Sequence, residues 1–183
     1  TAIQWIPTLQ FIQLSARDID QSLWQKEGWF VPWQHVVQFL APDFFGNPTT
    51  LNYWGVWNYG ELVGYVGILP LLFAITALLF RRNIQTFFFG LLLFLSLLFA
   101  LPTGISALPF VLHIPFLSTA QPTRLLFLTD FALAVLAAFG WDQFMKHKKQ
   151  IRIPVLIMFV GFLILWIATL FGEQFGITPE NLA

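Results

Sequence analysis

The chain has 183 residues, of which 57% are hydrophobic and only 10% are charged, whereas a soluble domain is usually about 25% charged. Nine basic and nine acidic side chains give a net charge of zero, so no nucleic-acid partner is indicated. The absence of cysteine excludes disulfides, thiolate metal sites and a cysteine nucleophile.

Two stretches without any Asp, Glu, Lys or Arg dominate the chain. One runs from 83 to 123, and the other, 153–172, would as a helix be about as long as the 30 Å hydrocarbon core of a bilayer. At these lengths only helices satisfy their own backbone groups in lipid. We therefore expect an all-α fold, a polytopic transmembrane helix bundle with helical or irregular extracytoplasmic segments.

The first residues, 1–14, are typical of the outer end of a membrane helix whose beginning is missing. We interpret the chain as an internal fragment of a larger polytopic protein. Gln10, Gln13 and Arg17 fall at i, i+3 and i+7, which places them on one helical stripe. Such a stripe is typical either of a water-filled cleft or of a solvated helix end, and the sequence favours neither.

An aromatic-rich segment, 15–61, follows and is predicted to be extracytoplasmic. Its tryptophan and tyrosine rings are typical of headgroup depth in a membrane. Within it the pattern predicts a short helix in the interface plane, with one apolar and one polar face: Trp33, Val36, Val37 and Leu40 against Gln34, His35 and Gln38. The part after this helix is dense in Gly, Pro and Asn, which predicts ordered turns.

Apolar runs of helical length predict four membrane spans, at 62–80, 84–101, 125–141 and 153–172. The segment 102–123 between the second and third spans contains an apolar piece that is too short to cross. We expect it to be re-entrant or interfacial. The last residues, 173–183, are expected to form an extracytoplasmic tail.

Charge asymmetry predicts the orientation of these spans. Six cations lie in the two short loops that follow the first and third spans: Arg81, Arg82, Lys146, Lys148, Lys149 and Arg152. Cytoplasmic loops collect Lys and Arg, so both loops are expected to face the cytoplasm. The segments 15–61, 102–123 and 173–183 then face outward.

Arg124 is the strongest candidate for chemistry. It lies at the start of the third span, on the side where cations are scarce. A helix N-terminus offers free N–H groups and a positive dipole end, and a guanidinium adds a planar fork of donors. Together they suit a lipid phosphate or diphosphate. The alternative is that Arg124 merely reaches to a lipid headgroup.

Asp130 lies deeper in the same span. A carboxylate there costs about 2.5–3.5 kcal/mol on insertion scales, so its side chain is expected to face protein or water. It is interpreted either as a site-lining or proton-handling acid or as a structural hydrogen-bonding group.

Other candidate site-lining residues lie in the aromatic-rich segment. Asp43 and Glu61 are possible general bases for a hydroxyl acceptor, although turn and helix capping explain such acids more often. Trp54 and Tyr53, with the neighbouring amides, offer the ring faces and hydrogen bonds that a sugar needs, or else belong to an aromatic belt. The three histidines lack metal-ligand spacing, so no metal site is predicted.

Three stretches of the chain resemble the bacterial YfhO family of large polytopic membrane proteins. They are QWIPTLQFIQLSAR, then FLAPDFFGNPTTLNYWGVWNYGELVGYVGILPLLF, and finally FLSTAQPTRLLFLTDFALAVLAAFGWD. The resemblance covers most of 2–142 in the expected order. It rests on the SAR after a Pro-containing helix, on the P-D-F-F-G loop with its later Y-W-G and E-x-x-G-Y-V-G, and on the P-x-R-L-L-F-L helix start.

That family is similar to the glycosyltransferases of the GT-C type, which use a polyprenyl-phosphate sugar as donor on the outer face of the membrane. The resemblance implies a multi-pass protein of the bacterial plasma membrane that transfers a sugar from a lipid-linked donor to a cell-envelope polymer, with no cofactor besides the donor. It implies Arg17 and Arg124 as positions that hold the lipid phosphate. It places the catalytic acid in an outer loop upstream of this chain, so no catalytic residue is assigned here.

Two alternatives remain open. One is a transporter or flippase of a lipid-linked precursor, which would be marked by half-helices and paired charges at midplane depth. The other is a non-catalytic envelope assembly protein. An acidic pair in the first outer loop of the upstream sequence would favour the transferase over both.

Overall fold

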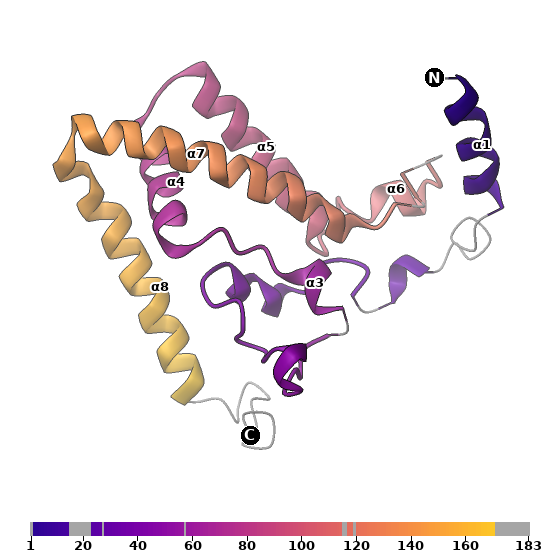
Figure 1. The fold of residues 1–183 in the computed structure, drawn as a ribbon, viewed down its shortest axis with the longest axis horizontal. Coiled ribbons are helices and arrows are strands. Elements are labelled where there is room, and N and C mark those ends of the chain that lie inside the picture. Colours follow the sequence, from indigo (N-terminus) through magenta and orange to yellow (C-terminus); the bar gives the residue numbers. More distant parts are fainter. Residues whose placement is uncertain are drawn as a thin grey trace.

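The structure is a computed structural model that describes residues 2–14, 23–26, 28–56, 58–114, 117–118 and 120–170. All regular elements in these ranges are helical, which confirms the all-α prediction (Figure 1). The longer helices are α1 (Ala2–Gln13), α4 (Ile68–Phe80), α5 (Ile84–Ala100), α7 (Leu126–Lys146) and α8 (Arg152–Leu170). The shorter ones are α3 (Tyr59–Leu62), α6 (Leu108–Val111), and the 3₁₀ helices η1 (Leu23–Gln25), η2 (Trp33–Phe39), η3 (Pro48–Thr50), η4 (Pro122–Leu125) and η5 (Lys148–Ile151).

Two helical stretches are long and apolar enough to cross a membrane by length and composition: Pro122–Lys146, which joins η4 to α7, and Lys148–Ala168, which joins η5 to α8. The apolar helices α4 and α5 are shorter, with 13 and 17 residues. At 1.5 Å per residue they extend about 20 and 26 Å along their axes.

The helix of the first predicted span begins at Ile68 rather than at Leu62. Residues 63–67 are not helical, and Gly67 has φ 99° and ψ 150°, a conformation that side-chain-bearing residues rarely adopt. Pro70 lies in the first turn of α4, as expected for a residue without an N–H. The chain between α3 and α4 is therefore an extended connection and not a first helical turn.

Helix α7 is the centre of the packing, because α4 and α5 both lie mainly against it and only slightly against one another. Ala74 and Ala77 of α4 form a buried cluster with Leu133 and Leu136 of α7. Further along, a Cβ added to Gly140 would lie 1.7 Å from the carbonyl oxygen of Phe73. Small residues thus allow the backbones of α4 and α7 to come into close contact.

A buried hydroxyl pair joins α5 to α7. The Ser96 and Thr129 hydroxyl oxygens lie 2.8 Å apart, and each is also within hydrogen-bond distance of a carbonyl oxygen of its own helix. In an apolar surrounding such an interhelical bond contributes about 0.6 kcal/mol. It also leaves neither hydroxyl without a partner.

The part of the aromatic-rich region that comprises 28–56 and 58–62, called here the aromatic segment, is attached to the ends of α5 and α7. Val31 and Leu62 form a buried cluster with Ala100 and Leu126. The Val31 N–H donates a hydrogen bond of 2.9 Å to the carbonyl oxygen of Ala100. The segment is therefore fixed to one end of the helical bundle.

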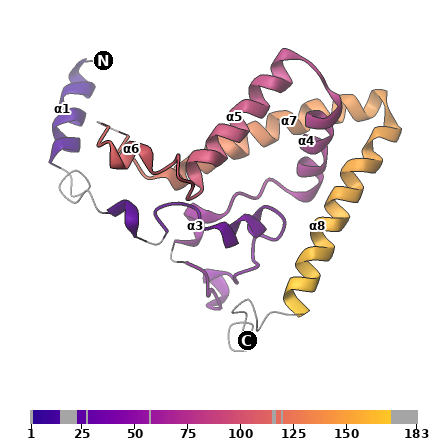
Figure 2. The same ribbon diagram turned by 180° about the vertical axis from the view of Figure 1, so that it is seen from behind.

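The opposite end holds the two turns 81–83 and 146–152, called here the basic end. The Arg81 guanidinium lies 4.0 Å from the ring centroid of Phe139 on α7, and Lys146 pairs with Asp142 at 2.9 Å. From this end α8 diverges from α7 and runs back towards the aromatic segment (Figures 1 and 2). Helix α1 lies apart from α4, α7 and α8, on the side of α6, in both views.

The contact of Gly140 with Phe73 predicts a large effect of a single methyl group. Gly140→Ala is expected to lower the free energy of unfolding by about 3 kcal/mol, because the added Cβ overlaps backbone atoms that have no rotamer to move to. Thermal or denaturant unfolding in detergent measures this. Gly104→Ala is the matched control, since nothing lies within 4 Å of its added Cβ. Equal stability of the two variants would contradict the packing.

Candidate functional site

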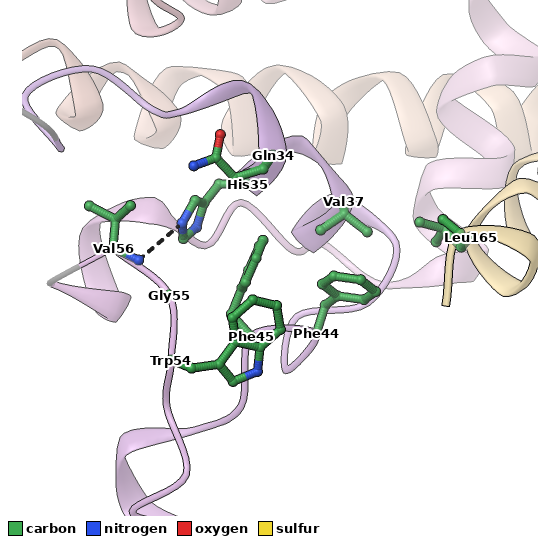
Figure 3. A pocket seen from close by; sticks show the side chains of 10 residues that line it. Gln34, His35, Val37, Phe44, Phe45, Trp54, Gly55, Val56 and Leu165 are labelled. Carbon is green, nitrogen blue, oxygen red and sulfur yellow. Dashed lines mark hydrogen bonds between the residues drawn. The ribbon is translucent and has the colours of Figure 1, made fainter. Parts of the chain in front are cut away.

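A cavity of about 700 Å³ lies between the aromatic segment and α8 (Figure 3). Its volume is in the range of small-molecule sites. Most of its lining comes from η2 and the loop that follows, and one side is closed by α8; the residues are Gln34, His35, Val37, Phe44, Phe45, Trp54, Gly55, Val56, Leu165 and Ala168. It is therefore an aromatic chamber with amide and imidazole groups and an apolar helical side.

Two of the three polar residues of η2, His35 and Gln38, point inward, which differs from the predicted interface helix, whereas Gln34 is exposed. The helix is present, but His35 and Gln38 are buried, whereas Trp33 and Val36 on the apolar face are exposed. The reason is that the two buried polar side chains are satisfied by one another and by backbone groups of the aromatic segment. Of the apolar residues, Val37 and Leu40 are half-buried, and Trp33 and Val36 are exposed.

Hydrogen bonds determine the tautomer of His35. The Gln38 amide nitrogen donates to the carbonyl oxygen of Pro42 at 2.9 Å, so its oxygen Oε1 faces His35 Nδ1 at 2.6 Å. Nδ1 therefore carries the hydrogen, and Nε2 accepts the Val56 N–H at 3.4 Å (Figure 3). The His35 ring thus links η2 to the backbone at Val56.

Stacked rings form the wall beside this imidazole. His35 stacks on Phe45 with ring centroids 4.4 Å apart, and Phe45 makes an edge contact with Trp54 at 4.8 Å. Phe44 packs on Phe45 at 5.2 Å. The structure therefore places Trp54, a predicted site-lining residue, in the wall of the chamber.

The loop 43–54 behind this wall is closed by polar side chains. Asn47 caps η3 by accepting the Thr49 N–H at 2.9 Å, and Asn52 Oδ1 accepts both the Asn47 N–H and the Thr50 hydroxyl. Gly46 has φ 77°, and an added Cβ would lie 2.2 Å from a backbone oxygen. This turn requires glycine, and it returns the chain so that Trp54 can reach the cavity.

Asp43, Tyr53 and Tyr59 come together on the outer side of this loop. The Tyr59 hydroxyl donates to Asp43 Oδ1 at 2.7 Å, and the rings of Tyr53 and Tyr59 meet edge to face at 5.5 Å. The hydrogen bond to Asp43 is the main cause that raises the pKa of Tyr59, whereas burial raises the pKa of Tyr53. Asp43 therefore accepts hydrogen bonds from a tyrosine hydroxyl and from the Asn47 side-chain amide.

Glu61 joins the aromatic segment to the start of α7. Its Oε2 accepts the Gln121 amide at 2.7 Å and lies 3.4 Å from the Thr123 hydroxyl. Arg124, the next residue, has an exposed side chain, and its guanidinium makes no hydrogen bond or ion pair with any residue that the structure describes. The guanidinium is thus available to a ligand, although Arg124 does not line the chamber.

Asp130 lies apart from the chamber and from the hydrogen bonds of Glu61. Its Oδ1 is buried and has no hydrogen-bond partner within the described ranges. An added Cβ on Gly64 would lie 3.3 Å from this oxygen and 2.7 Å from the ring of Phe39. The acid is therefore covered by the extended connection before α4, and it is not part of the chamber lining. Arg17 lies outside the described residues.

Sequence reasoning missed the most buried members of the site. His35 and Phe45 were not chosen, although the i, i+3 spacing of His35 and Gln38 was a signal for a bonded pair on one helical face. The contribution of Leu165 and Ala168 had no local signal, because only the return of α8 brings them to the chamber. Within the described residues no three His, Asp or Glu side chains gather as metal ligands.

Comparisons with family models, with curated proteins and with solved structures find no match to this chain. The resemblance to the YfhO family therefore stays a prediction.

The Asp43–Tyr59 bond predicts a tyrosine that ionises above its usual range. Replacing Asp43 with Asn should lower the pKa of Tyr59 towards the ordinary value of 10.0, because the carboxylate acceptor and its charge are lost. The stability that this bond contributes is fully present below pH 10 and is lost as the pH rises through the raised pKa.

A difference titration of tyrosine absorbance between the parent and Tyr59→Phe measures this pKa. Asp142→Asn, at the basic end, is the control and should leave the titration unchanged. A Tyr59 titration that does not respond to Asp43→Asn would show that the hydrogen bond is absent in solution.

Proposed function

We propose that this chain is part of a multi-pass protein of the bacterial plasma membrane, in which α4, α5, α7 and α8 cross the bilayer. As the YfhO resemblance implies, the protein acts as a glycosyltransferase of the GT-C type. It transfers a sugar from a polyprenyl-phosphate donor to a cell-envelope acceptor on the outer face. No residue of this chain is assigned the role of the catalytic acid.

The aromatic chamber is the observation that carries this proposal. A lipid-linked sugar has a ring with apolar faces and hydroxyl edges, joined to an apolar tail. The chamber offers the ring faces of Phe44 and Trp54, the amide of Gln34, and the apolar side of α8 directly beside them. A sugar in the chamber would meet matching ring faces and amide groups.

The donor phosphate is assigned to Arg124. The guanidinium is exposed and unpartnered among the described residues, and it precedes the first turn of α7. The bond of Glu61 to neighbouring Thr123 ties this position to α3, the short helix that leads out of the aromatic segment. As the sugar leaves the donor, charge grows on the phosphate, and a guanidinium stabilises it.

The orientation follows from the charges. With the basic end in the cytoplasm, the aromatic segment and Arg124 lie on the outer side, where polyprenyl-phosphate sugars are used. Exposed Trp33 and Val36 then meet the membrane interface, which agrees with the inward position of His35 and Gln38.

Cysteine labelling in intact cells tests this orientation, because the chain has no cysteine of its own. Thr49→Cys, at an exposed position of the aromatic segment, should react with a membrane-impermeant maleimide added outside the cell. Lys148→Cys should react only after the membrane is permeabilised. The reverse pattern would refute the proposed topology and with it the outer site.

Replacing Arg124 with Ala in the full-length protein should lower the rate of sugar transfer about a hundredfold, because one preorganised charge on the leaving phosphate is removed. Arg124→Lys should retain part of the rate, since it keeps the charge but not the planar fork. Transfer of radiolabelled sugar from a polyprenyl-phosphate donor measures the rate. Arg152→Ala, an exposed cation of the basic end, is the matched control. Equal rates for both alanine variants would exclude the phosphate role.

A further inference from the structure

A groove of about 780 Å³ lies between α4 and α5 at the basic end. It exists because both helices pack on α7 and hardly on one another, so their outer faces diverge. The two helices meet at Gly90, where an added Cβ would lie 3.1 Å from the Leu78 side chain. The residues that line the groove are Leu78, Arg81, Arg82, Asn83, Ile84, Thr86, Phe87, Gly90, Leu91 and Phe94.

The chemistry of this groove changes along its length. Away from the turn the lining is apolar and exposed, with Leu78, Phe87 and Phe94 as its large side chains. At the turn it becomes basic, with Arg81 and Arg82, and none of its lining residues is acidic. An apolar channel that ends in cations matches a molecule with a hydrocarbon chain and an anionic head.

The two arginines differ in their availability. Arg81 is occupied by the ring of Phe139, 4.0 Å from its guanidinium. Arg82 is exposed and has no hydrogen bond or ion pair to another side chain in the described part of the chain. The guanidinium N–H groups of Arg82 are therefore available to bind a ligand.

Polar groups of α5 reinforce this end of the groove. Asn83 caps the helix by accepting the Thr86 N–H at 2.8 Å, and the positive end of the α5 dipole points to the same place. Thr86 lines the groove and is only 4% exposed, and its Oγ1 has no hydrogen-bond partner among the described residues. A buried hydroxyl without a partner is unfavourable, and an acceptor oxygen from a ligand would satisfy it.

We propose that this groove binds an anionic phospholipid of the cytoplasmic leaflet. One acyl chain lies along Phe87, Leu91 and Phe94, and the phosphate lies at Arg82 and the first turn of α5. The inference rests on the membrane insertion and orientation of the proposed function, but not on sugar transfer. The basic end would then bind lipid, a role separate from the sugar transfer proposed for the outer side.

The experiment uses the full-length protein in nanodiscs that mix phosphatidylglycerol with phosphatidylcholine, and native mass spectrometry of the lipid that stays bound. Phosphatidylglycerol should be retained in preference to phosphatidylcholine. Arg82→Ala should weaken phosphatidylglycerol binding about tenfold, since a charge-assisted contact is lost. Thr86→Val, which removes the hydroxyl at equal size, should weaken it in the same direction. Arg152→Ala, which leaves the groove intact, should not change it.

Three results would overturn the proposal: no preference for phosphatidylglycerol, an equal loss in Arg82→Ala and Arg152→Ala, or full displacement of the lipid by excess inorganic phosphate. The last would mean that the site takes free phosphate. Failure of lipid binding in a protein that still transfers sugar would refute this inference alone. Inverted cysteine labelling would instead refute the proposed orientation.

Discussion

The close contact between α4 and α7 supports everything else in this structure. Gly140 brings the two backbones together, and the small side chains of Ala74 and Ala77 keep them close. Because α5 also packs on α7, Ala100 and Leu126 at the ends of these two helices form one platform, on which Val31 and Leu62 of the aromatic segment lie.

Polar groups are scarce here, and most of them are paired. Ser96 bonds to Thr129, His35 to Gln38, and Glu61 to Gln121, each within one buried or partly buried contact. Lipid and apolar cores make unpaired polar groups costly, so each pair removes a penalty. The exposed guanidiniums of Arg82 and Arg124, one at each end of the bundle, differ from these pairs. Neither guanidinium forms a hydrogen bond with the described part of the chain.

The sequence predicted the positions of the helices better than the contacts around them. The uncharged runs located α5 and α8 closely, because hydrophobicity and length are local properties. The start of α4 was misplaced, since the left-handed φ of Gly67 is not visible in an apolar pattern. The inward position of His35 and Gln38 was not foreseen either, because the partner of His35 includes a backbone group at Val56, far along the chain.

One wall of the chamber comes from residues early in the chain, and the other comes from α8, late in the chain. Gln34 to Val56 are synthesised long before Leu165 and Ala168, which complete the lining from α8. During translation the aromatic rings therefore emerge before the α8 residues that complete the lining. Without α8 the hollow would lose the side that Leu165 and Ala168 form and would be open there.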